Sequence, residues 1–107
     1  MTAQVWQAAE VPIEHEVLPD AGGQTAGSAD LGPFGAGSFG VWEIETGVST
    51  DVEADEVAVV LSGRGSVEDL DTGAVVDLAP GTILRLTAGT RTRWTITERL
   101  RKAYVVG

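Results

Sequence analysis

Four carboxylates between residues 51 and 56 run directly into the apolar segment VAVVL and a glycine turn. An ionised side chain at the mouth of a buried strand must pair with a cation, take up a proton or contact a ligand, because an unpaired buried charge is costly. Glu56 is therefore the first candidate for chemistry. It could act as a general acid/base or orient a ligand amine, or it could simply form an ion pair that joins two strands.

Several side chains could complete a site around Glu56. Residues two apart share one face of a strand, which places Thr92 and Trp94 together. Lys102 and three arginines, Arg85, Arg91 and Arg93, are the possible cations. The predicted pocket contains an acid, a hydroxyl and an indole, and could hold a small molecule. The candidate ligand-binding residues are Asp51, Glu56, Thr92, Trp94, Lys102 and Tyr104.

Other motifs lack the structural context that their usual ligand-binding functions require. GAGSFG at 35–40 matches a dinucleotide-binding pattern, but a loop is expected before it and a strand after it, so we interpret it as a loop. DLDTG at 69–73 begins like a calcium loop whose twelfth position falls on Pro80, and is predicted to be a turn. His15 is the only histidine, and we expect it to be solvated in an acidic arm.

Composition limits the function classes. The 107 residues suit one domain, and their net charge of −9 argues against nucleic acid or an anionic membrane as partner. The sequence has no cysteine, which excludes disulfides and thiolate metal sites. We expect neither a signal peptide nor a membrane span, and predict a cytoplasmic protein.

The charges are segregated along the chain. Residues 81–107 contain six of the seven bases and one acid, Glu98. This segment could form a basic surface for an acidic ligand. Alternatively, acidic and basic strands lie side by side and pair across a sheet, which is the interpretation we favour.

Short runs rich in Val, Ile, Thr and Trp alternate with Gly, Pro and Asp every eight to twelve residues, a spacing typical of an all-β sandwich or barrel. Strands are predicted near 41–46, 49–54, 56–62, 65–69, 74–78, 82–87, 91–97 and 102–106. DTG at 71–73 and APG at 79–81 are predicted turns. Residues 1–40 are predicted to be an arm and a glycine-rich irregular loop, and 41–107 the compact barrel.

Two segments resemble the conserved motifs of the cupin superfamily. Gly47, Glu56 and Gly63 stand at the spacing of the first motif, and Gly81 and Gly89 at that of the second. VWE, DEVAVVLSGRG, AGTRTRW and RLRKAYVV, in that order between residues 41 and 106, are similar to the DUF861 or Cupin_3 group. That group includes the (S)-ureidoglycine aminohydrolase cupin domain and the ethanolamine-utilisation cupin. The resemblance implies a single-domain double-stranded β-helix, or jelly roll, usually homodimeric.

The resemblance also implies where a metal would bind. In metal-binding cupins, two histidines of the first motif, its glutamate and one histidine of the second hold the ion. Here those positions fall on Ser49 and Asp51, or Thr50 and Val52, and on Thr92; only Glu56 matches. The three-histidine site is therefore absent, and no cofactor is expected. If a metal binds at all, the oxygen ligands are Ser49, Asp51, Glu56 and Thr92, which suit magnesium, calcium or manganese.

Three functions remain open on this evidence. The first, which we favour, is metal-independent binding of an unknown small molecule in the barrel lumen. The second is an enzyme of the aminohydrolase-like or isomerase type that uses Glu56 as its catalytic acid/base. The third is a structural or accessory homodimer without a ligand.

Overall fold

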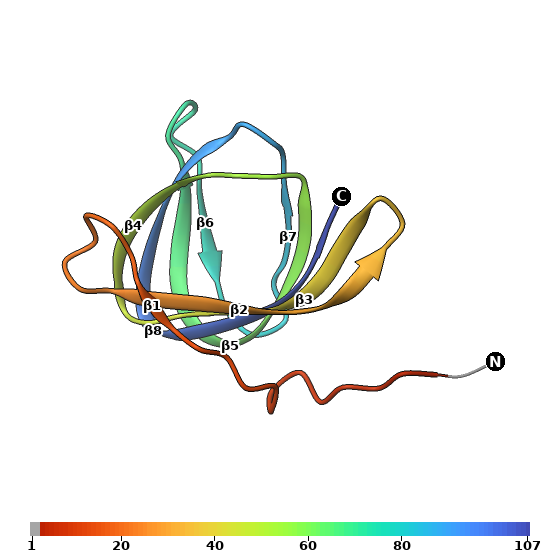
Figure 1. The fold of residues 1–107 in the computed structure, drawn as a ribbon. Coiled ribbons are helices and arrows are strands. Elements are labelled where there is room, and N and C mark those ends of the chain that lie inside the picture. Colours follow the sequence, from red (N-terminus) through yellow and green to blue (C-terminus); the bar gives the residue numbers. More distant parts are fainter. Residues whose placement is uncertain (1–2) are drawn as a thin grey trace.

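The computed structural model describes residues 3–107. The helices and strands assigned within that range are all β-strands (Figure 1). The strands are β1 (Glu16–Val17), β2 (Thr25–Phe34), β3 (Gly37–Ile44), β4 (Gly47–Val52), β5 (Glu56–Asp69), β6 (Val75–Leu78), β7 (Ile83–Leu86) and β8 (Arg91–Val106). No helix long and apolar enough to cross a membrane occurs among the described residues. The all-β prediction is confirmed.

Strand β8 organises the sheet. Its first half pairs with β4 and its second half with β3, while β5 pairs with it along nearly its whole length. All pairings are antiparallel, in the order β1-β2-β3-β8-β5-β6, with β4 added to β8 and β7 to β5. The sheet curves around an enclosed interior, as a jelly-roll cupin fold does (Figure 1).

Strands β5 and β8 are each longer than predicted, since the sequence indicated two strands in each place. In β5, the glycines at 63 and 65 mark irregularities of register rather than a turn. Gly63 has a φ of 94°, and a Cβ there would collide with the Arg99 carbonyl group. The two long strands thus bend together without separating, and this bend helps to close the barrel.

The apolar core fills one part of the interior. It follows the alternation of the strands, and its members come mainly from β5, β7 and β8. The buried cluster consists of Ala26, Ile44, Val60, Val67, Leu78, Leu84, Leu86, Trp94, Ile96 and Leu100, with Leu18 and Trp42 packed against it.

The prediction of an irregular loop at 21–40 is wrong. Strand β2 and the first residues of β3 lie there and form a hairpin, and β2 belongs to the same sheet as the barrel strands. Its glycines provide space: a Cβ on Gly27 would collide with the Glu14 carbonyl of the arm, and one on Gly40 with the Tyr104 ring. GAGSFG is consequently part of a hairpin, with its turn at Gly35 (φ 59°), and neither a loop nor a nucleotide site.

The two predicted turns are confirmed. Asp69 ends β5 and accepts hydrogen bonds at Oδ1 from the backbone N–H groups of Asp71 and Thr72. In the second turn, the Thr82 N–H group donates to the Ala79 carbonyl and Gly81 has a φ of 93°. DLDTG therefore forms a turn at the end of β5, as predicted.

Candidate functional site

A cavity of about 460 Å³ lies between the strands, beside the apolar core. Alternation along β3 and β8 points Trp42, Lys102 and Tyr104 into it, and β4 and β5 contribute the carboxylates. The lining residues are Leu18, Pro19, Ala26, Ser28, Trp42, Ile44, Ser49, Thr50, Asp51, Glu53, Glu56, Trp94, Lys102, Tyr104 and Val106.

An ion pair forms part of the cavity wall. Lys102 Nζ donates to Glu56 Oε2 at 2.6 Å, and the two side chains are only 5% and 13% exposed. The same ammonium lies 4.6 Å from the centre of the Trp42 ring and 4.9 Å from that of Trp94. One carboxylate and two indole faces thus stabilise a single buried cation. Of the cations considered for Glu56, Lys102 is its partner.

A second carboxylate is held by hydrogen bonds alone. Glu53 Oε2 accepts from the Thr92 hydroxyl at 2.6 Å and from Trp94 Nε1 at 3.0 Å. Trp94 Nε1 also lies 3.1 Å from Thr92 Oγ1. Thr92 is buried behind the cavity wall, so it positions Glu53 and Trp94 and does not itself line the cavity.

Asp51 and Tyr104 lie where ionisation is disfavoured. Burial, and next the negative charge of Glu53, raise the pKa of Asp51. Burial, and next the charge of Asp30, raise the pKa of Tyr104. Tyr104 is therefore a neutral hydroxyl at physiological pH and can donate a hydrogen bond to a ligand.

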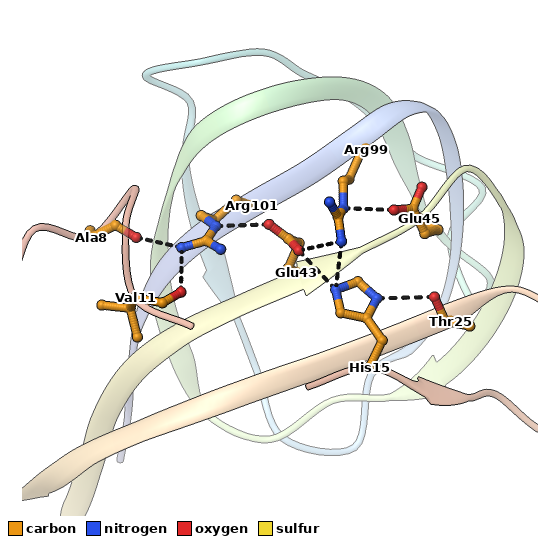
Figure 2. A network of polar contacts seen from close by, with 8 residues as sticks. All are labelled: Ala8, Val11, His15, Thr25, Glu43, Glu45, Arg99 and Arg101. Carbon is orange, nitrogen blue, oxygen red and sulfur yellow. Dashed lines mark hydrogen bonds and ion pairs between the residues drawn. The ribbon is translucent and has the colours of Figure 1, made fainter. Parts of the chain in front are cut away.

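A separate network lies on the outer face of the same sheet (Figure 2). Glu43 accepts from Arg101 Nε at 2.8 Å and contacts Arg99 and His15 at 2.9 and 2.8 Å. Burial alone would raise the pKa of Glu43, but Arg101, His15 and Arg99 outweigh it and lower that pKa. Arg101 also donates to the Ala8 and Val11 carbonyls, and so ties the N-terminal arm to the barrel.

His15 does not behave as predicted. Its side chain is only 13% exposed and bridges β2 and β3, with Nδ1 3.0 Å from Thr25 Oγ1 and Nε2 facing Glu43. The arm folds against β2, which the sequence had indicated to be a loop, and this packing removes His15 from solvent. The histidine is part of a structural network on the face of the sheet opposite to the cavity.

Pairing across the sheet accounts for most of the basic C-terminal segment. Arg93 lies opposite Glu68 in the β5–β8 register and contacts it at 3.1 Å, and Arg91 contacts Asp71 at 2.6 Å. Arg99, Arg101 and Lys102 have carboxylate partners too. The segregation of charge therefore reflects strand neighbours, as the favoured interpretation held.

Comparison with known proteins identifies the family. The model of the EutQ-like cupin domain matches residues 31–104. This chain belongs to the EutQ-like cupin family. No protein of curated function matches the chain.

Solved structures agree with this EutQ-like cupin fold. The EutQ protein of Clostridium difficile is 18% identical, with a TM-score of 0.65 over 78% of this chain and 68% of that one. A protein of unknown function from Rhizobium leguminosarum is 25% identical, with a TM-score of 0.68 over 99% and 97%. A DUF861 protein of unknown function from Pseudomonas syringae is 19% identical, with a TM-score of 0.76 over 92% and 45%. The cupin resemblance and the fold are confirmed.

The side chains of this EutQ-like cupin do not fit the ion that the resemblance associates with metal-binding cupins. Glu56 already holds the Lys102 ammonium, and the Thr92 hydroxyl donates a hydrogen bond to Glu53. Within residues 3–107, no group of three or more His, Cys, Asp or Glu side chains is arranged to hold a metal. The Lys102 ammonium occupies the position beside Glu56 that a metal dication would take. The ammonium and the dication would repel each other.

Sequence reasoning placed five of the six candidate ligand-binding residues on the cavity wall, but it missed two that matter. Glu53 was passed over in favour of Asp51, although it follows β4 and is more deeply buried. Trp42 was not included, although it pairs with Lys102 in the β3–β8 register. Its position on β3, two residues before Ile44 and so on the same face, was the signal that it faces inward.

Proposed function

We propose that this EutQ-like cupin binds a small organic molecule in the barrel lumen without a metal. The observation that carries the proposal is the buried Lys102 ammonium, held by Glu56 and two indoles on the wall of a cavity. A volume of about 460 Å³ falls within the range of small-molecule sites. Aromatic faces with a few convergent polar groups are the usual composition of such a site.

A thermal-shift screen of metabolites on untagged protein tests this proposal. A ligand of the lumen should raise the melting temperature of the wild type, by mass action, and lose most of its effect in Glu56→Gln and Lys102→Met. Glu68→Gln is the matched control, because Glu68 lies on the same strand but pairs with Arg93 at the surface. Equal stabilisation of all four proteins, or none in any of them, would contradict the proposal.

Acid/base catalysis by Glu56 is the second candidate function. Its carboxylate lies within hydrogen-bond distance of one amine at the cavity wall and could exchange a proton with a ligand placed there. On this hypothesis Glu56→Gln abolishes turnover of the identified ligand while binding, measured by calorimetry, is weakened far less. Full turnover by Glu56→Gln would exclude the acid/base role.

Metal content should be measured on the same untagged, cytoplasmically expressed protein, since a histidine tag would supply foreign ligands. With zinc, iron and manganese in the medium, we expect far less than one metal per chain by mass spectrometry. About one metal per chain, lost in Glu56→Ala, would replace the metal-independent proposal by an oxygen-liganded site made from Ser49, Asp51, Glu56 and Thr92.

A homodimer is the assembly that we propose. The outer face of the sheet carries a groove of about 590 Å³ in which no lining residue is charged. Phe34, Val57, Ile83 and Val105 on its wall are 67, 48, 74 and 42% exposed. Because each chain carries a net charge of −9, two copies repel one another unless uncharged surfaces meet, and this groove is such a surface.

Light scattering with size-exclusion chromatography tests the dimer. Ile83→Glu should give a monomer, whereas Ile83→Val should leave the mass of a dimer unchanged. A wild-type protein that is monomeric at high micromolar concentration would contradict the homodimer, and would leave the lumen proposal untouched.

A further inference from the structure

Lysine usage in this chain is unusual. Of the seven basic residues six are arginines, and Lys102 is the only lysine. Lysine is normally among the most exposed residue types, yet Lys102 is 4% exposed. Arginine makes stronger bidentate pairs with carboxylates but cannot act as a nucleophilic amine, whereas a buried lysine can. Among the basic residues of the described range 3–107, the one that lines the cavity is the lysine.

The surroundings of Lys102 are those of an amine nucleophile with its base. An ammonium has no free electron pair, so it must first pass a proton to an acceptor. Glu56 Oε2, 2.6 Å away, can take that proton. Trp42 and Trp94 flank the amine, and Tyr104 provides a hydroxyl two residues along the same strand face. A nucleophile and a base within hydrogen-bond reach form the usual signature of covalent catalysis.

We propose that Lys102 captures a carbonyl compound in the lumen as a Schiff base. The ammonium gives a proton to Glu56, and the Nζ electron pair forms a bond to the carbonyl carbon while the carbonyl oxygen is protonated by Glu56. Glu56 then removes a proton from nitrogen and delivers it to the hydroxyl group, which leaves as water. The product is a protonated imine, so one ammonium and one carbonyl give one iminium and one water.

Charge is conserved in this sequence. The iminium carries the same positive charge as the ammonium that it replaces, so the pair with Glu56 and the contacts with both indoles persist after capture. The reaction therefore leaves no buried carboxylate without a cation, which would be costly. This inference rests on the proposed function of the lumen as a binding site, and it names the class of ligand.

Small uncharged aldehydes are the compounds that the lumen suits. Asp51, Glu53 and Glu56 face the cavity against the single ammonium, so a ligand with its own carboxylate or phosphate would meet repulsion. The indoles of Trp42 and Trp94 offer apolar surface for a short carbon chain. The hydroxyls of Ser28 and Tyr104 can donate to oxygen atoms on that chain.

Reductive trapping provides the test. Propionaldehyde and cyanoborohydride are added to the folded protein, and the reduced adduct is located by mass spectrometry of peptides. Since Lys102 is the only lysine, the other amine in the chain is the N-terminal one. Arg85→Lys supplies an internal reference, because Arg85 is exposed on β7 and its replacement gives an ordinary surface amine in the same molecule.

The expected result is that Lys102 is labelled at least about tenfold faster than the exposed reference amine in the folded protein. Unfolding in urea should remove the difference. Glu56→Gln, which keeps the amine but removes the base, should slow labelling of Lys102 towards the reference rate. Labelling of Lys102 no faster than that of the reference amine would overturn the proposal, and this comparison needs no variant of the lumen.

The two proposals fail separately. A metabolite that raises the melting temperature of the wild type but not of Glu56→Gln, together with slow labelling of Lys102, would leave lumen binding intact and overturn Schiff-base capture. Fast labelling that is blocked by such a metabolite supports both. Fast labelling that no aldehyde analogue slows would mean that Lys102 reacts without a binding site, and it would overturn both proposals.

Discussion

Two buried carboxylate–cation pairs lie back to back across one sheet of this EutQ-like cupin. Lys102 points into the lumen towards Glu56, and its chain neighbour Arg101 points outward to Glu43. The outer pair has many partners: Glu43 has three basic partners, and Arg101 also donates to two arm carbonyls (Figure 2). The inner pair has one hydrogen bond between its members and borders a cavity.

This difference in the number of partners distinguishes a structural ion pair from a candidate functional one more clearly than burial does, because both pairs are buried. A densely partnered network leaves few donors or acceptors for a ligand, and it holds the arm against the barrel. An ammonium with one carboxylate partner has two further N–H donors, and here it faces an open volume. Lysine inside and arginine outside agree with these roles, because arginine suits fixed multidentate pairing.

The largest effect is expected from breaking the outer network. Glu43→Gln should lower the free energy of unfolding by about 3–5 kcal/mol, because it leaves Arg101 buried without a carboxylate. Urea denaturation gives the value. Glu68→Gln is the control, since its pair with Arg93 is largely exposed and should contribute no more than about 1 kcal/mol. Equal losses in the two variants would contradict the assignment of Glu43 as a structural centre.

The Glu43 effect should depend on pH in a defined direction. The pKa of Glu43 is lowered below its ordinary value of 4.5 in the folded protein. Its stabilisation is therefore complete above 4.5 and is lost as the pH falls through the lowered pKa of the folded state. The gap in unfolding free energy between wild type and Glu43→Gln should close in acid. A gap that is constant from neutral pH down to acid would contradict this.

The inner pair should contribute less, because its members border a cavity that water can enter. Lys102→Met should lower the free energy of unfolding by about 1.5–3 kcal/mol, the range for a charged hydrogen bond. The double variant Lys102→Met, Glu56→Gln should recover most of that loss, since neither charge is then left unpaired. If Lys102→Met lowers the free energy of unfolding more than Glu43→Gln does, the inner pair is the structural one and the comparison is reversed.

The same contrast explains what could be predicted from the sequence. The sequence suggested Glu56, Lys102 and Tyr104 as parts of one pocket, and all three line the same cavity, since motif spacing is a local property of the chain. His15 and the strand character of residues 25–34 were missed. The arm folds over β2, and this brings His15 against Glu43, 28 positions later, and against Arg99, 84 positions later. Contacts so distant in the sequence are not visible in a local pattern. Glycine at 27 and 40 looked like loop composition, but serves close packing in a sheet.

The smallest effect is expected at Asp51, at the rim of the lumen. Burial and the charge of Glu53 raise its pKa above the ordinary value of 3.8, so this carboxylate favours the folded state only in acid and disfavours it once ionised. Asp51→Asn should therefore raise the free energy of unfolding near neutral pH, by no more than about 0.5 kcal/mol because Asp51 is exposed and solvent screens its charge. The Asn side-chain oxygen can still accept from the Val52 N–H group. The gain should disappear as the pH falls below 3.8. Asp77→Asn on the exposed strand β6 is the control and should change stability less. A loss of stability at neutral pH in Asp51→Asn would mean that ionised Asp51 is favourably paired, and the lumen would then hold its cation less exclusively through Glu56.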